Sequence, residues 1–153
     1  MSEPLVSIVI PLYNKSDWII PTLISVTRQE HSNWECIIVD DGSMDETFHT
    51  VKKYAEMYHN IKYVYHSNKG TGLSKNAGIL AASRMFITFL DSDDEWFPEK
   101  LEKQHKILLA DKSISFIGCL INDANSNKSP LINISLINLI FKNYFQPSTV
   151  LFN

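Results

Sequence analysis

The sequence predicts an α/β fold, with a mostly parallel, Rossmann-like sheet and helices on both of its faces. Strand and helix signals alternate along the 153 residues, which is the order expected when crossover helices connect parallel strands. The predicted strands are continuous apolar runs, which is typical of strands buried on both faces. Polar clusters follow the first, second and fourth strands, at the edge where such sheets bind ligands.

The pattern begins with a β-branched strand over residues 6–10, which Pro11 is expected to end. A helix is predicted over 16–28. It contains Pro21, which removes a backbone hydrogen bond, so we expect a kink or a late start. The second strand covers residues 35–39.

Ser43 and Glu46 have the spacing of a capping box, which predicts a second helix directly after them. Apolar residues at helical spacing continue that helix, and a third strand follows over 61–65. The next helix is predicted over 70–83.

The alternation continues with a fourth strand over 85–90, and Pro98 fits the first position of the helix after it. The remaining predicted elements are strands over 114–121 and from 149, a loop over 122–130 and a short helix over 135–144. Because no repeat or linker divides the chain, residues 1–153 are predicted to form a single domain.

Composition narrows the class of protein. Hydrophobic residues make up 44% and charged residues 20%, as in soluble globular domains, and the net charge of −3 gives no reason to expect nucleic-acid binding. Cys36 and Cys119 fall in predicted buried strands, and without a CxxC motif they favour a reducing, cytoplasmic location. The apolar stretch 131–141 is too short and polar to span a bilayer; a core helix is favoured, and peripheral membrane contact stays open.

Three carboxylates stand within four positions at Asp91, Asp93 and Asp94, directly after the strand over 85–90. Two unit charges about 4 Å apart repel by roughly 4 kcal/mol at an effective dielectric constant of 20, so something positive must offset them. A divalent cation held by oxygen ligands is the simplest candidate. On an extended backbone Asp91 and Asp93 project from the same face, which suits a metal that in turn holds a diphosphate.

Two further clusters each allow a functional and a purely structural interpretation. Asp40 and Asp41 either form an ordinary strand-to-helix turn or accept hydrogen bonds from a base or ribose. Gly70 and Gly72 precede a helix that carries Lys75; this suits a phosphate, although an ordinary turn explains the glycines equally well. The GxGxxG fingerprint and the P-loop ending are both absent from the sequence.

Four segments together resemble the motifs of the family-2 inverting glycosyltransferases, in their order and rough spacing. They read VSIVIPLYN at 6–14, IIVDDGS at 37–43, KNAG at 75–78 and LDSDD at 90–94, with Lys75 where that family usually has Arg. The resemblance covers residues from about 6 to 152. It implies the GT-A fold and the N-terminal, nucleotide-sugar-binding portion of such an enzyme.

The resemblance also implies a role for each matching residue. Pro11 and Tyr13 would line the base pocket, Asp41 with Asp40 would contact uracil or ribose, Lys75 would lie near the diphosphate, Asp91, Ser92 and Asp93 would form a D-x-D motif, and Asp94 would support the loop or face the donor sugar. Asp93 is the expected direct ligand of Mn²⁺ or Mg²⁺, and Asp91 is expected to face ribose or the metal. The expected donor is a nucleotide-sugar, with UDP as the usual nucleotide.

The implied activity is transfer of a sugar to an acceptor hydroxyl with inversion, in cell-surface polysaccharide or glycolipid synthesis. The family's carboxylate base takes the acceptor proton and is expected beyond Asn153, because no acid follows Asp123. We therefore expect the donor-binding half of a transferase, with weak or absent transfer, in the cytoplasm or at the inner face of the membrane. The donor sugar, the sugar or lipid-linked acceptor and the oligomeric state stay open.

Three other classes of protein compete with this interpretation. A nucleotidyltransferase that makes sugar nucleotides would have a glycine-rich loop after the first strand, where residues 12–15 read LYNK. A phosphorylated receiver module has its acidic pair after the first strand rather than the second. A non-catalytic nucleotide-binding module, which is a truncated or dead transferase, is the alternative that the missing base keeps open.

Overall fold

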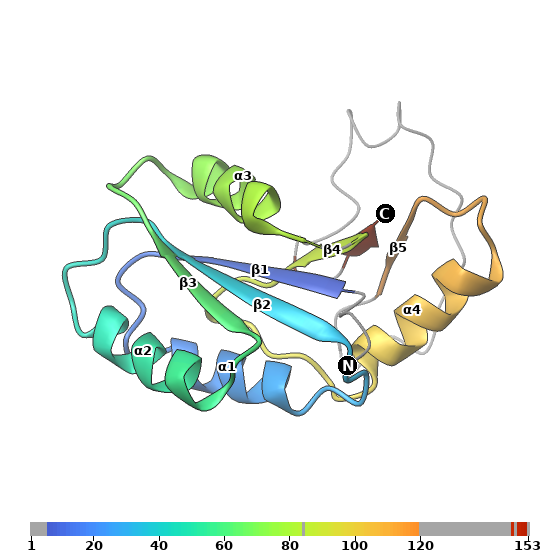
Figure 1. The fold of residues 1–153 in the computed structure, drawn as a ribbon, viewed down its shortest axis with the longest axis horizontal. Helices are drawn as coiled ribbons and strands as arrows, with labels where there is room; N and C mark the ends of the chain where they lie inside the picture. The colour runs from blue at the N-terminus through green and yellow to red at the C-terminus, as the bar shows by residue number, and fades with distance from the viewer. Residues whose placement is uncertain (1–5, 84, 120–147, 149, 153) are drawn as a thin grey trace, which may run out of the picture.

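The computed structural model of the chain describes residues 6–83, 85–119, 148 and 150–152 (Figure 1). Six strands form one sheet in the order β3-β2-β1-β4-β6-β5. The elements are β1 (Val6–Leu12), α1 (Ile19–Thr27), β2 (Trp34–Asp40), α2 (Thr47–Met57), β3 (Ile61–Tyr65), α3 (Thr71–Ala81), β4 (Phe86–Phe89), α4 (Lys100–Ala110), β5 (Phe116–Gly118) and β6 (Val150–Phe152).

The sheet is parallel through four of its strands and antiparallel toward one edge. β1 pairs in parallel with β2 on one side and with β4 on the other, and β2 pairs in parallel with β3. β6 runs antiparallel to both β4 and β5. The chain thus reverses its direction of winding between β1 and β4, and ligands bind beside such a reversal, at the carboxyl ends of the strands. The predicted, mostly parallel α/β fold is confirmed.

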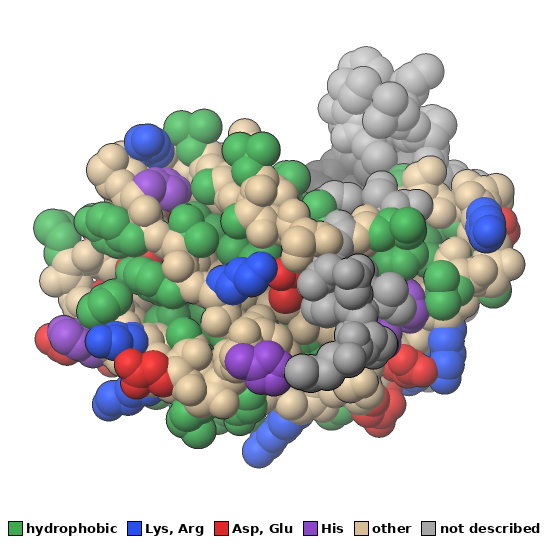
Figure 2. Space-filling model, viewed as in Figure 1, with side chains coloured by type: hydrophobic (Ala, Val, Ile, Leu, Met, Phe, Trp, Pro, Cys, Tyr) green, Lys and Arg blue, Asp and Glu red, His purple; other side chains and the backbone are tan. Residues whose placement is uncertain are grey.

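Helices cover both faces of the sheet, also as predicted (Figure 1). α1, α2 and α4 share one face, over a buried core to which they contribute Leu23, Val51 and Leu101. α3 lies on the opposite face, over the smaller buried cluster around Val9 and Ile37. On the described part of the visible surface, acidic and basic side chains are interspersed among hydrophobic ones (Figure 2).

α3 approaches the sheet closely because Gly78 faces β1. A Cβ atom at Gly78 would lie 2.2 Å from Cγ1 of Val9, far inside van der Waals contact, so only glycine fits there without displacing the helix. The start of α3 and the end of β1 consequently border the same cavity, which is described below.

Two prolines lie in elements that the sequence only partly predicted. β1 continues through Pro11 to Leu12, whereas the strand was expected to end at Pro11. β4 pairs with β1 only as far as Val9, so beyond that point β1 has β2 as its described neighbour and the missing N–H is tolerated. α1 starts late, as expected, and Pro21 falls in its first turn, where N–H groups have no acceptor within the helix.

Three further local predictions were wrong. The capping box does not form, because α2 begins after Glu46 without a side-chain cap and the Ser43 hydroxyl instead accepts a hydrogen bond from the Asn14 N–H at 2.8 Å. Pro98 precedes α4 by two residues rather than opening it. Cys36 is buried in β2, but Cys119 follows β5 and is only partly buried.

The loop predicted over 122–130 and the helix predicted over 135–144 lie outside the described residues. Among the helices that the structure describes, none has the length and apolar character needed to cross a membrane.

Candidate functional site

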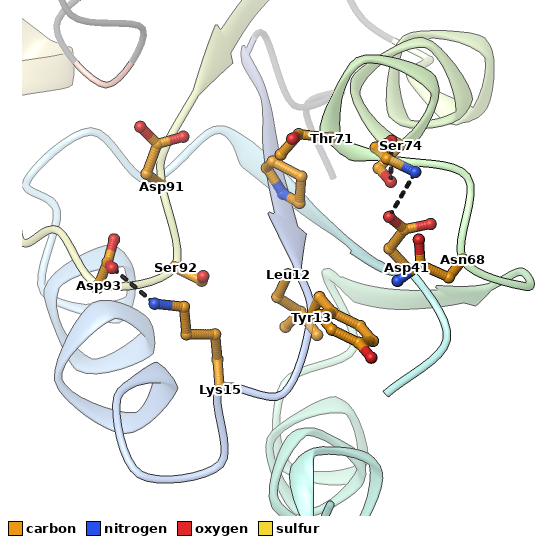
Figure 3. Close-up of a pocket in the computed structure, with 12 residues that line it drawn as sticks. Leu12, Tyr13, Lys15, Asp41, Asn68, Thr71, Ser74, Asp91, Ser92 and Asp93 are labelled. Carbon is orange, nitrogen blue, oxygen red and sulfur yellow. Dashed lines mark hydrogen bonds and ion pairs between the residues drawn. The ribbon is translucent and has the colours of Figure 1, made fainter. Parts of the chain in front are cut away.

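A cavity of about 380 Å³ opens at the carboxyl edge of the sheet, where β1, β4 and the start of α3 meet (Figure 3). Four stretches of the chain, far apart in sequence, contribute to its wall. The lining residues are Pro11, Leu12, Tyr13, Lys15, Asp41, Asn68, Gly70, Thr71, Ser74, Asp91, Ser92 and Asp93.

The end of β1 supplies the wall around Tyr13, whose side chain is 40% exposed. The next residue, Asn14, has a positive φ of 49°, a conformation that asparagine tolerates better than most residues. Its N–H donates to Ser43 Oγ and its side-chain oxygen accepts from the Met44 N–H at 2.9 Å. These bonds hold the turn after β1 against the turn after β2, and so fix the position of Tyr13.

Asp41 lies in the cavity wall and is buried. Its two carboxylate oxygens accept hydrogen bonds from the N–H groups of Lys69 at 2.7 Å and Gly70 at 2.8 Å. The second of these bonds is the dashed line at Asp41 in Figure 3. The ring nitrogen Nδ1 of His66 lies 3.3 Å from the same carboxylate. Asp41 therefore fastens the loop before α3 to the end of β2 and fixes where the helix begins.

Asp40 faces away from the cavity lining, unlike its neighbour. Its carboxylate accepts the Ser43 N–H at 2.7 Å and the hydroxyl of Tyr63 on β3. Burial, followed by the hydrogen bond to Asp40 and the charge of that carboxylate, raises the pKa of the Tyr63 hydroxyl. Of the two adjacent acids, the structure brings only Asp41 to the cavity and gives Asp40 a bracing contact between strands.

Asp91, Ser92 and Asp93 all line the cavity, as three predicted site residues. The segment is a turn rather than an extended strand, because the Asp94 N–H donates to the Asp91 carbonyl at 3.0 Å. The Ser92 carbonyl accepts the Thr22 hydroxyl at 3.1 Å, which ties this turn to α1. The expectation that an extended backbone aligns the two carboxylates was thus wrong, although the turn also brings both to the cavity.

Each of these two carboxylates has a lysine partner. Lys75 Nζ lies 3.6 Å from Asp91 Oδ1, and Lys15 Nζ lies 2.8 Å from Asp93 Oδ2 (Figure 3). Lys75 is not part of the lining, but its ammonium is paired with Asp91, which is. Part of the positive charge that the acidic segment requires therefore comes from the chain itself.

The first turn of α3 borders the opposite side of the cavity. Its leading N–H groups have no acceptor within the helix and carry partial positive charge. Sequence reasoning singled out the glycine at 70 but missed Asn68, Thr71, Ser74 and Lys15 as lining residues. No local pattern distinguishes these four from ordinary loop and helix residues, so only the position of the helix start hinted at Thr71.

The donor set fits a hard divalent cation in part. Asp91 and Asp93 offer two carboxylates to the cavity. This number fits Mg²⁺, which is usually bound by one or two carboxylates and completes its coordination shell with water and substrate phosphates. Within the described residues, no group of three or more His, Cys, Asp or Glu side chains is arranged to hold a metal alone. Such an ion would therefore depend on oxygens from a ligand.

A mostly parallel α/β sheet with an acidic cavity at its winding reversal is the arrangement of a ligand-binding α/β domain. The chain matches the family described as "Glycosyl transferase family 2" over residues 7–150. Because this match covers nearly all of the sequence, the chain belongs to glycosyltransferase family 2.

Curated relatives agree with this family. The chain is 40% identical over 115 residues to TuaG of Bacillus subtilis, which is named as a teichuronic acid biosynthesis glycosyltransferase, over 74% of this chain and 45% of TuaG. It is 38% identical over 118 residues to WfgD of Escherichia coli, named as a UDP-Glc:alpha-D-GlcNAc-diphosphoundecaprenol beta-1,3-glucosyltransferase, over 76% of this chain and 46% of WfgD. The chain thus spans less than half the length of these two relatives.

Solved structures show the same fold at lower identity. S. aureus TarS 1-349 in complex with UDP-GlcNAc superimposes with a TM-score of 0.78 at 24% identity, over 95% of this chain and 44% of that one. The mannosyltransferase PcManGT from Pyrobaculum calidifontis, in complex with GDP-Man and Mn²⁺, gives a TM-score of 0.79 at 20% identity, over 99% and 45%. The predicted GT-A fold is thereby confirmed.

Proposed function

We propose that this chain binds a UDP-sugar together with Mn²⁺ or Mg²⁺ and forms the donor side of an inverting glycosyltransferase. The supporting observation is the single cavity that unites Tyr13, Asp41, Asp91 and Asp93 from three different strand ends. Each matches a motif residue that was singled out from the sequence, and their meeting at one edge is what a nucleotide-binding site of this fold requires.

The base and ribose are assigned to the wall formed by Pro11, Tyr13 and Asp41. Tyr13 offers an accessible aromatic surface, and the Asp41 carboxylate is held by two backbone N–H groups. Carboxylate oxygens each have a second lone pair, so Asp41 can still accept from a donor such as the ring N–H of uracil. Asp40, which braces Tyr63, is withdrawn from this role and acts by supporting the same turn.

The diphosphate is assigned to the space between the start of α3 and the acidic turn. The N-terminus of the helix at Thr71 favours an anion, and Lys75 adds a full positive charge beside Asp91. The cation assigned to Asp93 and Asp91 would neutralise charge on the departing diphosphate. These residues of the chain would then bind and orient the donor.

The acceptor is proposed to be lipid-linked, because WfgD is named for a diphosphoundecaprenol-linked acceptor. Use in cell-surface polysaccharide synthesis is proposed alongside it, because TuaG is named for teichuronic acid biosynthesis. A membrane-borne acceptor would bring the chain to a membrane surface. The cytoplasmic location is a separate prediction, which rests on cysteine usage. The proton-accepting carboxylate is still expected beyond Asn153 and also stays a prediction.

Calorimetric titration of UDP, with and without Mn²⁺, tests the proposal. We expect binding that strengthens with Mn²⁺, and loss of that metal-dependent part in Asp93→Asn. Asp17→Asn is the matched control, because it removes the same charge from an exposed residue that does not line the cavity. Equal UDP affinity with and without Mn²⁺, or an Asp93→Asn variant identical to the parent, would refute the assignment.

A further inference from the structure

Lys15 is the charged residue of the cavity lining that the proposed function leaves without a role. Its side chain is 32% exposed, lines the cavity and places Nζ 2.8 Å from Asp93 Oδ2. The contact joins residues 78 positions apart, from the loop after β1 and the turn after β4. Figure 3 shows the ammonium of Lys15 pointing toward that carboxylate.

The backbone of Lys15 is firmly held although its side chain is not. Its N–H donates to Thr47 Oγ1 at 2.9 Å, and its carbonyl accepts the N–H groups of Trp18 and Ile19, both at 3.0 Å. The backbone of Lys15 is therefore fixed, and only rotation of its side chain can move the ammonium. If it leaves Asp93, side-chain rotation alone redirects it within the same cavity.

The carboxylate that Lys15 contacts is the one assigned to the metal. An ammonium at 2.8 Å and a divalent cation repel each other and compete for the same oxygen lone pairs. Asp93 has a second carboxylate oxygen, so it is the repulsion between the two cations that favours the departure of Lys15 when a metal binds. The freed ammonium of Lys15 then lies beside the proposed diphosphate. That group would carry more negative charge than any other anion in the cavity.

We propose that Lys15 exchanges partners: it pairs with Asp93 until a divalent cation takes that carboxylate, and it then pairs with a phosphate oxygen of the donor. The inference rests on the proposed function and adds a donor-binding residue to it. Lys75 differs, since its ammonium lies 3.6 Å from Asp91 and outside the cavity lining.

The exchange predicts effects of opposite sign on the two ligands. Lys15→Met keeps the length of the side chain and removes its charge, so Mn²⁺ alone should bind about two- to fivefold more tightly, the range expected for a partly exposed ion pair. UDP in saturating Mn²⁺ should bind about tenfold more weakly, because a charge-assisted hydrogen bond to phosphate is lost. A role in folding alone would move both affinities in one direction.

The experiment measures free Mn²⁺ by electron paramagnetic resonance and UDP affinity by calorimetry, for the parent, Lys15→Met and Lys15→Gln. Lys103→Met is the control, because it removes an exposed lysine of α4 and should change neither affinity. Unchanged or weaker Mn²⁺ binding in both Lys15 variants would overturn the competition, and unchanged UDP affinity would overturn the exchange. A parent that binds neither Mn²⁺ nor UDP would instead refute the proposed function, and the inference would fall with it.

Discussion

Replacing Glu35 with glutamine should destabilise the sheet, because this buried carboxylate joins four segments of the chain. Its oxygen Oε1 accepts the Ser7 hydroxyl at 2.6 Å and both the N–H and the hydroxyl of Ser83 at 2.8 Å. Oε2 accepts the Lys62 ammonium at 2.8 Å. Glu35 thereby links β2 to β1, β3 and the segment between α3 and β4, yet it lies outside the cavity.

The pKa of Glu35 gives the magnitude of its contribution to the free energy of unfolding. Burial alone would raise it, but hydrogen bonds from Lys62, Ser7 and Ser83 outweigh burial and lower the pKa from 4.5 to about 2. At about 1.4 kcal/mol for each pKa unit, the ionised carboxylate contributes roughly 3 kcal/mol to stability at neutral pH. Because the folded pKa is the lower one, this contribution is complete above pH 4.5 and is lost as the pH falls toward 2.

Urea unfolding of the parent and Glu35→Gln at about pH 7 and about pH 3 measures the effect. Lys62 is half-exposed and regains water when it loses its partner, so we expect a loss of about 2 kcal/mol at pH 7, shrinking to about 1 kcal/mol or less at pH 3. Glu56→Gln, which alters an exposed 3.8 Å pair on α2, should change stability by less than about 0.5 kcal/mol. A variant as stable as the parent at pH 7, or a difference of constant size at both pH values, would refute the reasoning.

Three further predictions concern packing and titration. Gly78→Ala should cost about 1–2 kcal/mol, because overpacking against Val9 exceeds the gain of ~1 kcal/mol from alanine in a helix; a melting temperature at or above that of the parent would contradict this. Gly42→Ala should weaken UDP binding in calorimetry, because Gly42 has a φ of +81° and a Cβ there would lie 2.8 Å from the Asn68 nitrogen; full affinity would show that this turn does not position the loop. Burial lowers the pKa of His105, so the folded chain binds fewer protons than the unfolded chain and stability should fall below about pH 6.5. His105→Gln should flatten this slope in urea unfolding, and an unchanged slope would assign it to other groups.

Much of the fold could be predicted because its strands are buried on both faces and separated by clear helix signals. The wrong predictions occurred where a tertiary contact overrode a local sequence pattern. The Ser43 hydroxyl caps no helix because it accepts the Asn14 N–H from another loop. Pro11 does not end β1 because β4 no longer pairs with the strand at that point.

The site residues that directly follow a strand could be predicted from the sequence. Whether a given side chain points into the cavity was harder to predict. Asp40 and Asp41 are adjacent acids in the sequence, and the Ser43 N–H and the Tyr63 hydroxyl hold Asp40 away from the cavity. Lys15 was missed because its partner, Asp93, is 78 residues away and no local pattern marks the contact. Such pairings depend on strand order, which the sequence specifies only through the complete fold.

In the proposed site, one cavity holds a nucleotide by its base at Asp41 and, through the cation, by its diphosphate at Asp93. A crystal structure of the chain with UDP and Mn²⁺, with anomalous scattering to locate the metal, tests this most directly. We predict the uracil against Tyr13 and Asp41, and the Mn²⁺ peak at bonding distance from the Asp93 carboxylate. UDP bound elsewhere, or an anomalous peak remote from both Asp91 and Asp93, would contradict the account.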